Sequence, residues 1–265
     1  MEELKMKKTF IGLIIISLSF TLFSGFTKET TQVSSLYQVS TLQALIKGAY
    51  DGAITTKELI KHGNTGLGTF DKLDGEMIVI EGKVYKATTE GKILLVSNNE
   101  TIPFANVGFI SSSATKQTSF NGAYDGLKDK LNSLYPKENM PILFSIGGDF
   151  ENVTCRSVPK QQKPYRPLTE VVKEQVVFKK EKVSGTLVGF RFPEYMSDFN
   201  TAGYHLHFIS DDKTFGGHLL DIKSGNINVK TQSLNGFNVY LPEYINDISL
   251  SENNQKDIAT VEKGK

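Results

Sequence analysis

The chain has 265 residues, of which 39% are hydrophobic and 22% are charged, and its formal net charge is +1 at pH 7. This composition is typical of a globular protein and excludes a disordered or fibrous chain. The balanced charge gives no electrostatic reason to expect nucleic acid or an anionic membrane as a partner. The single cysteine, Cys155, excludes an intrachain disulfide, so we expect a packed core with Cys155 buried in it.

The first 26 residues predict a secretory signal peptide rather than a part of the fold. Residues 1–8 are charged, and the apolar stretch FIGLIIISLSFTLFSGF that follows has small residues near its end. This stretch is shorter than the ~20 apolar residues of a membrane-spanning helix, which makes an uncleaved anchor the less favoured alternative. We therefore expect a secreted protein with no stable membrane association after processing, and a mobile leader over residues 27–39.

Residues 40–163 are predicted to form the N-terminal α/β half. Ser40 is expected to cap a helix that ends at Gly48, and a second short helix is expected over Lys57–Lys61. The runs MIVI, KVYKA and ILLV, separated by Glu-Gly turns, predict short strands, as does the run FANVGFI.

The rest of this half contains one longer helix and one predicted hairpin. Leucines at helical spacing predict an amphipathic helix over residues 121–135. The segment PILFSIGGDFENVTCRSV is interpreted as a hairpin that turns at Gly147-Gly148.

Residues 164–265 are predicted to form a C-terminal, metal-binding half that ends in a C-terminal tail. A linker over 164–167 leads to a predicted helix, TEVVKEQVVF, and then to the strands GTLVGFRF, GYHLHF, HLLDI, NINVKTQ and GFNVYLP. The similar segments GEMIVIEGKVYK and GHLLDIKSGNINVK are both interpreted as hairpins, which suggests two related halves. The expected fold class is α/β (α+β), with mixed, largely antiparallel sheets and flanking helices.

The segment GYHLHFISDDKTFGGH, residues 203–218, contains three of the four histidines. Alternation on a strand places His205 and His207 on one face, opposite to Leu206 and Phe208. A turn at Gly216-Gly217 would return His218 beside this pair. Three neutral imidazoles with a fourth position open are typical of a catalytic zinc site, although imidazole also suits copper, iron and nickel.

Three blocks, GLGTFDKLDGEM, CRSVPKQQKPY and GYHLHFISDDKTFGGHLLDI, resemble the acetolactate decarboxylases in order and spacing. The resemblance extends from residue 34 to the C-terminal tail. It implies that zinc is bound by three ligands, which are His205, His207 and His218. It also implies a homodimer.

The same resemblance assigns the remaining site residues. Glu76 is implied as the acidic residue at the site, Arg156 as the cation that faces the substrate, and Thr69 as a residue that lines the pocket. The family also uses a glutamate from its C-terminal tail, for which Glu262 is the best match and Glu252 the alternative.

The implied reaction is the decarboxylation of 2-acetolactate to acetoin and CO2 by a carboxy-lyase. Zinc would stabilise an enediolate, Arg156 would orient the substrate carboxylate, and Glu262 would protonate the enediolate. One alternative is a cupin-like metal dioxygenase, but its pattern has a glutamate shortly after the second histidine, where this chain has FISDDK. The other alternative, a non-enzymatic exported metal-binding protein, leaves the first two blocks without a role.

Overall fold

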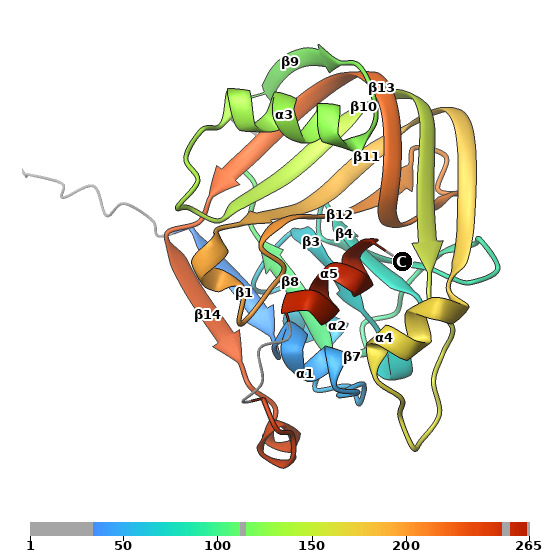
Figure 1. Ribbon diagram of the computed structural model, residues 1–265, viewed down its shortest axis with the longest axis vertical. Helices are drawn as coiled ribbons and strands as arrows, with labels where there is room; N and C mark the ends of the chain where they lie inside the picture. Colours follow the sequence, from blue (N-terminus) through green and yellow to red (C-terminus); the bar gives the residue numbers. More distant parts are fainter. Residues whose placement is uncertain (1–33, 112–114, 251–254, 264–265) are drawn as a thin grey trace, which may run out of the picture. The chain divides into compact units, whose positions relative to one another are not determined.

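The computed structural model describes residues 34–111, 115–250 and 255–263, and all structural statements below concern these residues (Figure 1). They form two large β-sheets with short helices around them, together with a two-stranded pair of β2 (Ile54–Thr55) and β7 (Thr101–Ile102). The expected fold class is confirmed, because every strand pairing is antiparallel except the one between the first strand and the last. The predicted signal peptide over residues 1–26 lies outside the described residues.

The first sheet has seven strands in the order β14-β1-β8-β3-β4-β5-β6. Their bounds are Ser35–Val39 for β1, Thr65–Thr69 for β3, Glu76–Ile80 for β4, Lys83–Ala87 for β5, Ile93–Leu95 for β6, Phe104–Gly108 for β8 and Gly236–Tyr240 for β14. Both Leu36 and Val39 of β1 are fully buried. The prediction of a mobile leader is therefore wrong for residues 35–39, which are held by pairing with β8 and β14.

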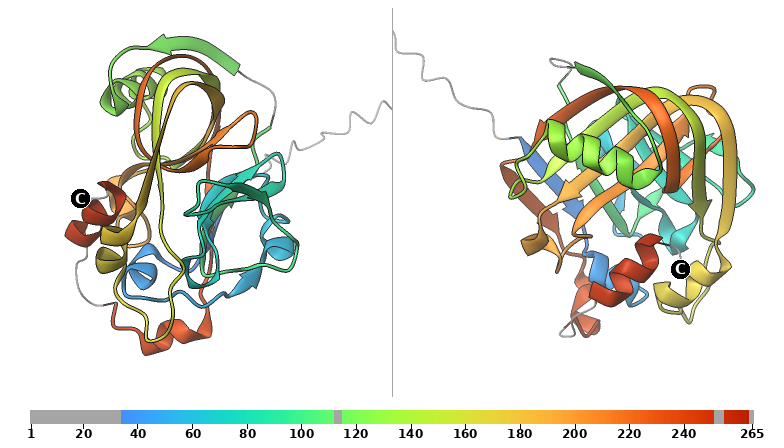
Figure 2. Two further views of the ribbon diagram at one scale, coloured as in Figure 1. Left: turned by 90° about the vertical axis from the view of Figure 1, so that its right-hand side faces the viewer. Right: turned by 45° about the horizontal axis from the view of Figure 1, so that its top comes forward.

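The second sheet has five strands in the order β10-β11-β12-β13-β9, with a further pairing between β10 and β13. Their bounds are Thr115–Phe120 for β9, Ile142–Ser157 for β10, Val176–Phe192 for β11, Gly203–Ser210 for β12 and Gly216–Ser233 for β13. The additional pairing closes four strands on themselves, and Figure 2 shows the long strands curving round in this closed arrangement. The inner faces of these strands form a large hydrophobic core.

Five α-helices lie around the sheets, with bounds Leu42–Ile46 for α1, Thr56–Leu59 for α2, Tyr124–Leu134 for α3, Leu168–Val171 for α4 and Gln255–Lys263 for α5. Four 3-10 turns complete the elements, over Asp71–Leu73, Val172–Glu174, Glu194–Met196 and Glu243–Asp247. Helix α3 covers the second sheet with Leu127 and Leu131 buried beneath it (Figure 1). Helices α1, α4 and α5 share a smaller apolar cluster. None of the described helices is long and apolar enough to cross a bilayer.

The predicted β4–β5 hairpin forms as expected. The two hairpins predicted within β10 and β13 are wrong, because each segment is part of one continuous strand. Gly147-Gly148 lies inside the continuous strand β10, where a Cβ at Gly148 would lie 2.4 Å from the carbonyl oxygen of Asn226. Gly225 lies inside β13, where a Cβ would lie 2.8 Å from the oxygen of Asp149. These glycines permit close approach of neighbouring strands, so they mark contact rather than reversal.

Gly216-Gly217 is likewise not the turn that was expected. The chain reverses earlier, over residues 211–215, where Ser210 N–H donates to the Phe215 carbonyl at 2.8 Å. Gly217 has a φ of +147° and a Cβ there would lie 2.4 Å from the carbonyl oxygen of Arg156. Only glycine fits this position, which lets β13 run against β10 beside His218.

The helices differ from their predictions mainly at their ends. Thr41 rather than Ser40 caps α1, since its hydroxyl accepts from Ala44 N–H at 3.1 Å. The segment TEVVKEQVVF stays helical only to Glu174, after which its three apolar residues begin β11. Pairing with β10 provides the backbone hydrogen bonds of this last part and overrides its helical pattern.

The predicted halves, 40–163 and 164–265, are not separate in the structure. Strand β10 from the first range pairs along its length with β11 and β13 from the second. Strand β14 from the second range pairs with β1 in the seven-stranded sheet. The boundary between the two sheets therefore does not coincide with residues 163 and 164.

Candidate active site

Three histidine side chains meet on the face of the second sheet that packs against the first. His207 lies directly opposite His218 across β12 and β13, and His205 lies two residues before His207 on the same face. One nitrogen from each ring lies within 4.8 Å of the others. Leu206 and Phe208 point to the opposite face and into the core, as alternation predicts.

The three rings are neutral, so each keeps one nitrogen lone pair that a metal can bind. The Nδ1–H of His207 donates to the Met77 carbonyl at 2.8 Å, which leaves Nε2 as the acceptor nitrogen. Burial lowers the pKa of all three imidazoles, to about 3 for His205, with Arg156 contributing in the same direction. His205 Nδ1 and His207 Nε2 are buried without a hydrogen-bond partner among the described residues. The third ring differs, because His218 Nε2 lies 3.3 Å from the Glu262 backbone carbonyl. Three neutral imidazoles with convergent nitrogens are a donor set that fits a metal ion.

Glu76 is presented by a tight turn between β3 and β4. The hydroxyl of Thr69, which lies opposite Glu76, donates to the Gly75 carbonyl at 2.8 Å and so fixes this turn. Gly75 has a φ of +90°, and a Cβ there would lie 2.6 Å from the Ala87 carbonyl oxygen. The turn brings Glu76 Oε2 to 3.7 Å from His207 Nε2.

Glu262, on α5, lies beside the other two histidines. Its Oε1 lies 3.7 Å from His205 Nδ1 and its Oε2 lies 3.7 Å from His218 Nε2. Burial raises the pKa of both Glu262 and Glu76 to about 7, while Arg156 acts to lower both. Two carboxyl groups that can hold a proton near neutral pH therefore lie beside the histidines.

Arg156 supplies a buried cation to the same place. It lies opposite His218 in the β10–β13 pairing and is 3% exposed. Its Nη1 donates to Gln175 Oε1 at 3.3 Å, and its Nε is buried without a partner in the described structure. Burial lowers its pKa and the two glutamates raise it, so the guanidinium stays charged.

A cavity of about 40 Å³ joins these groups. It brings together all seven predicted site residues, which are Thr69, Glu76, Arg156, His205, His207, His218 and Glu262. The alternative glutamate, Glu252, lies outside the described residues. The apolar wall of the cavity was not predicted from the sequence, and its members are Leu42, Leu45, Leu73, Phe104, Val158, Leu168, Val172 and Val261. Their helical and strand patterns indicated only burial.

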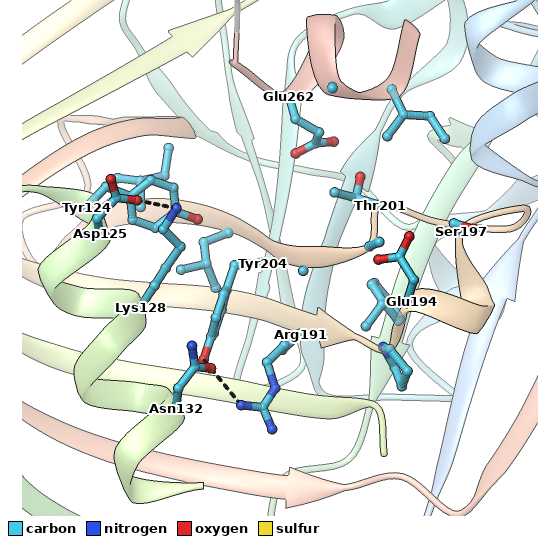
Figure 3. A pocket seen from close by; sticks show the side chains of 18 of the residues that line it. Tyr124, Asp125, Lys128, Asn132, Arg191, Glu194, Ser197, Thr201, Tyr204 and Glu262 are labelled. Atoms are coloured by element: carbon cyan, nitrogen blue, oxygen red, sulfur yellow. Dashed lines mark hydrogen bonds and ion pairs between the residues drawn. The ribbon is translucent and has the colours of Figure 1, made fainter. Parts of the chain in front are cut away.

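A wider cleft of about 1030 Å³ shares His218 and Glu262 with this cavity. Figure 3 shows Glu262 and Thr201 on one side of the cleft and Tyr204, Arg191 and Asn132 on another. Glu262 and His218 therefore stand where the small cavity meets the wider cleft.

Cys155 and the fourth histidine, His62, do not line the small cavity. Cys155 is fully buried, as expected, and burial raises the pKa of its thiol. The fourth histidine, His62, stacks on the Tyr37 ring at 3.8 Å and lies 3.4 Å from Glu58.

Comparisons with known proteins agree on one family. The model of the family described as alpha-acetolactate decarboxylase matches residues 36–248. The alpha-acetolactate decarboxylase of Methanosarcina mazei is 41% identical over 231 residues, covering 86% of this chain and 80% of that protein. That of Bacillus subtilis is 36% identical over 233 residues, covering 87% of this chain and 91% of that protein.

A solved structure gives the same result for the fold. The crystal structure of the alpha-acetolactate decarboxylase from Bacillus subtilis strain 168 superimposes with a TM-score of 0.83 at 35% identity. It covers 86% of this chain and 99% of that one. The resemblance carried by the three sequence blocks is thus confirmed, and the chain belongs to the alpha-acetolactate decarboxylase family of carboxy-lyases.

Proposed function

We propose that this enzyme converts 2-acetolactate to acetoin and CO2 with a zinc ion held by His205, His207 and His218. The observation that carries the proposal is the convergence of three neutral imidazoles, one guanidinium and two carboxyl groups in one buried cavity. The assignment of 2-acetolactate as the substrate is supported by the relatives, which are named alpha-acetolactate decarboxylases. The all-imidazole donor set supports zinc, which favours three protein ligands and one open position in catalytic sites.

The reaction breaks the bond between the substrate carboxylate and the neighbouring carbon. The electron pair of that bond moves into the ketone, CO2 leaves, and an enediolate remains. When bound, zinc supplies Lewis acidity, which stabilises the negative charge that develops on the substrate oxygens. Arg156 orients the carboxylate before it leaves, and Glu76 lies beside His207 whereas Glu262 lies beside His218.

Glu262 is assigned as the proton donor to the enediolate carbon, because its raised pKa and its place at the cavity edge suit a general acid. We expect Glu262→Gln to slow acetoin formation by at least about a hundredfold, the lower range for general acid catalysis. A single positioned acid protonates one face of the enediolate and so gives one enantiomer of acetoin. The residual acetoin of the variant should therefore be closer to a racemic mixture, which chiral chromatography measures. Glu262→Gln protein with full rate and full stereoselectivity would contradict the assignment.

The function itself is tested by acetoin formation from racemic 2-acetolactate. We expect the purified protein to form acetoin, to stop after chelator treatment and to recover when zinc is added. A folded, zinc-loaded protein that forms no acetoin would leave only a metal-binding role. Recovery of activity with another divalent ion but not with zinc would contradict the assignment of zinc and leave the decarboxylase function standing.

Export and dimer formation are proposed separately. The charged n-region and apolar h-region within residues 1–26 support secretion, and the mass of the protein in the culture medium would show whether this segment is removed. The family resemblance supports a homodimer, and light scattering of the purified protein would show a single-chain mass if this is wrong.

A further inference from the structure

The Glu262 side chain is aimed by more than the helix that carries it. Ile258 and Val261 of α5 are buried in the apolar cluster shared with α1 and α4, which sets the position and rotation of the helix. A glutamate still has three rotatable side-chain bonds, so packing of the helix alone does not fix its carboxyl group. A polar group near the carboxyl is needed to select one orientation.

The residue that faces the carboxyl is Thr201. Its side chain lies beside Glu262 at the edge of the wide cleft (Figure 3), and its hydroxyl acts to lower the pKa of the Glu262 carboxyl group. Thr201 is 7% exposed, and its hydroxyl is buried without a partner at full hydrogen-bonding distance in the described structure. A buried hydroxyl without a partner costs free energy, so this position favours an interaction that completes it.

The backbone that carries Thr201 is firmly held. Asn200 is fully buried and accepts a hydrogen bond from the Asn106 side chain of β8 at 2.9 Å. It also donates to the side-chain oxygen of Gln38 in β1, and Gln38 in turn donates to the Phe199 carbonyl at 3.1 Å. This buried amide network attaches the segment before β12 to the seven-stranded sheet, so Thr201 is a fixed point against which α5 can align.

We propose that Thr201 is a positioning residue whose hydroxyl holds the Glu262 carboxyl group over the histidine cluster. The hydroxyl can donate to a carboxylate oxygen, so the contact selects one orientation of the Glu262 side chain. Catalytic hydrogen bonds are often long in ligand-free structures and shorten when substrate binds. The proposal rests on the proposed function, because Thr201 acts through the proton donor.

The test replaces Thr201 with valine, which keeps the branched shape and removes the hydroxyl. We expect kcat for acetoin formation to fall about tenfold to hundredfold, as for loss of one hydrogen bond to a charged group. KM and zinc content should stay unchanged, because Thr201 does not line the cavity that contains the three histidines. Thr201→Ser should recover most of kcat, and hydrogen exchange of the α5 amides should be faster in Thr201→Val than in wild type.

Two further variants separate positioning from general structure. Thr260→Val makes the same change on α5, where the hydroxyl donates to the Lys256 carbonyl of its own helix at 3.0 Å, and should leave kcat unchanged. In a Glu262→Gln background, Thr201→Val should have little further effect, since both act on one step. Thr201→Ala repeats the test if the valine variant does not fold.

The outcomes are distinct. Wild-type kcat and wild-type α5 exchange in Thr201→Val would overturn the proposal. A loss of kcat that is the same with and without Glu262 would also overturn it, because Thr201 would then act on something else. If the wild-type protein forms no acetoin, the proposed function fails first, and the exchange of α5 still decides whether Thr201 holds Glu262.

Discussion

His207→Ala is expected to abolish metal binding and acetoin formation together. The ring is 1% exposed and its Nδ1–H is committed to the Met77 carbonyl, so Nε2 is oriented toward the other two histidines. Loss of partners around metal ligands costs about 10- to 100-fold in affinity or activity. Loss of a ligand should therefore reduce acetoin formation by more than a hundredfold. Zinc per chain by elemental analysis and acetoin per chain are the paired measurements.

The matched control is the fourth histidine. His62 is 37% exposed and stacks on Tyr37 away from the cavity, so His62→Ala should keep both zinc and turnover. Circular dichroism of both variants separates loss of the metal from loss of the fold. A His207→Ala protein that retains stoichiometric zinc and normal turnover would remove His207 from the ligand set.

Arg156→Ala is expected to separate turnover from metal binding. The guanidinium is the buried cation that faces both glutamates, and it is not part of the histidine cluster. Zinc content should therefore be unchanged, while kcat/KM should fall by about a hundredfold or more, the usual effect of removing one preorganised donor to a developing or departing charge. Steady-state kinetics and elemental analysis on one protein sample measure both quantities.

Arg156→Lys tests what the charge alone can do. Lysine keeps the cation but loses the planar fork that matches a carboxylate, so we expect only partial recovery of kcat/KM. Full activity in Arg156→Ala would contradict a role for the guanidinium in substrate orientation. Loss of zinc in the same variant would show instead that Arg156 maintains the site itself.

Local periodicity predicted much of the molecule correctly. The β4–β5 hairpin and the alternation of His205 and His207 depend on neighbours along the chain, and both appear in the structure as expected. The approach of His218 to His207 was also anticipated, although the reversal occurs over residues 211–215.

Glycine pairs were the main source of error. In a sequence, a glycine that permits a turn and one that permits close strand contact have the same pattern. Gly148 and Gly217 belong to the second kind, because the carbonyl oxygens of Asn226 and Arg156 approach them from strands far along the chain. The pairing of β10 with both β11 and β13 could not be deduced without knowing these partners.

The site residues also differ in whether the sequence alone could predict them. The histidine cluster followed from spacing, whereas Glu76 and Arg156 were identified only through the family resemblance, since single charged residues are usually solvated. The Met77 carbonyl and the Thr201 hydroxyl had no signal in the sequence. Their roles depend on which strand or helix lies against them in the folded chain.

The closed arrangement of β10, β11, β12 and β13 has a consequence for how the protein folds. Arg156 and His218 become neighbours only when β10 pairs with β13, although they are far apart in the chain. Closing such long loops is slow, because the entropy of the intervening chain is lost before the contacts form. The three histidines lie on the local β12–β13 hairpin, so a folding intermediate with this hairpin formed would already hold the histidine cluster. Metal capture would then precede the closure of the strands, and the arrival of Arg156 beside His218 would mark the completion of folding.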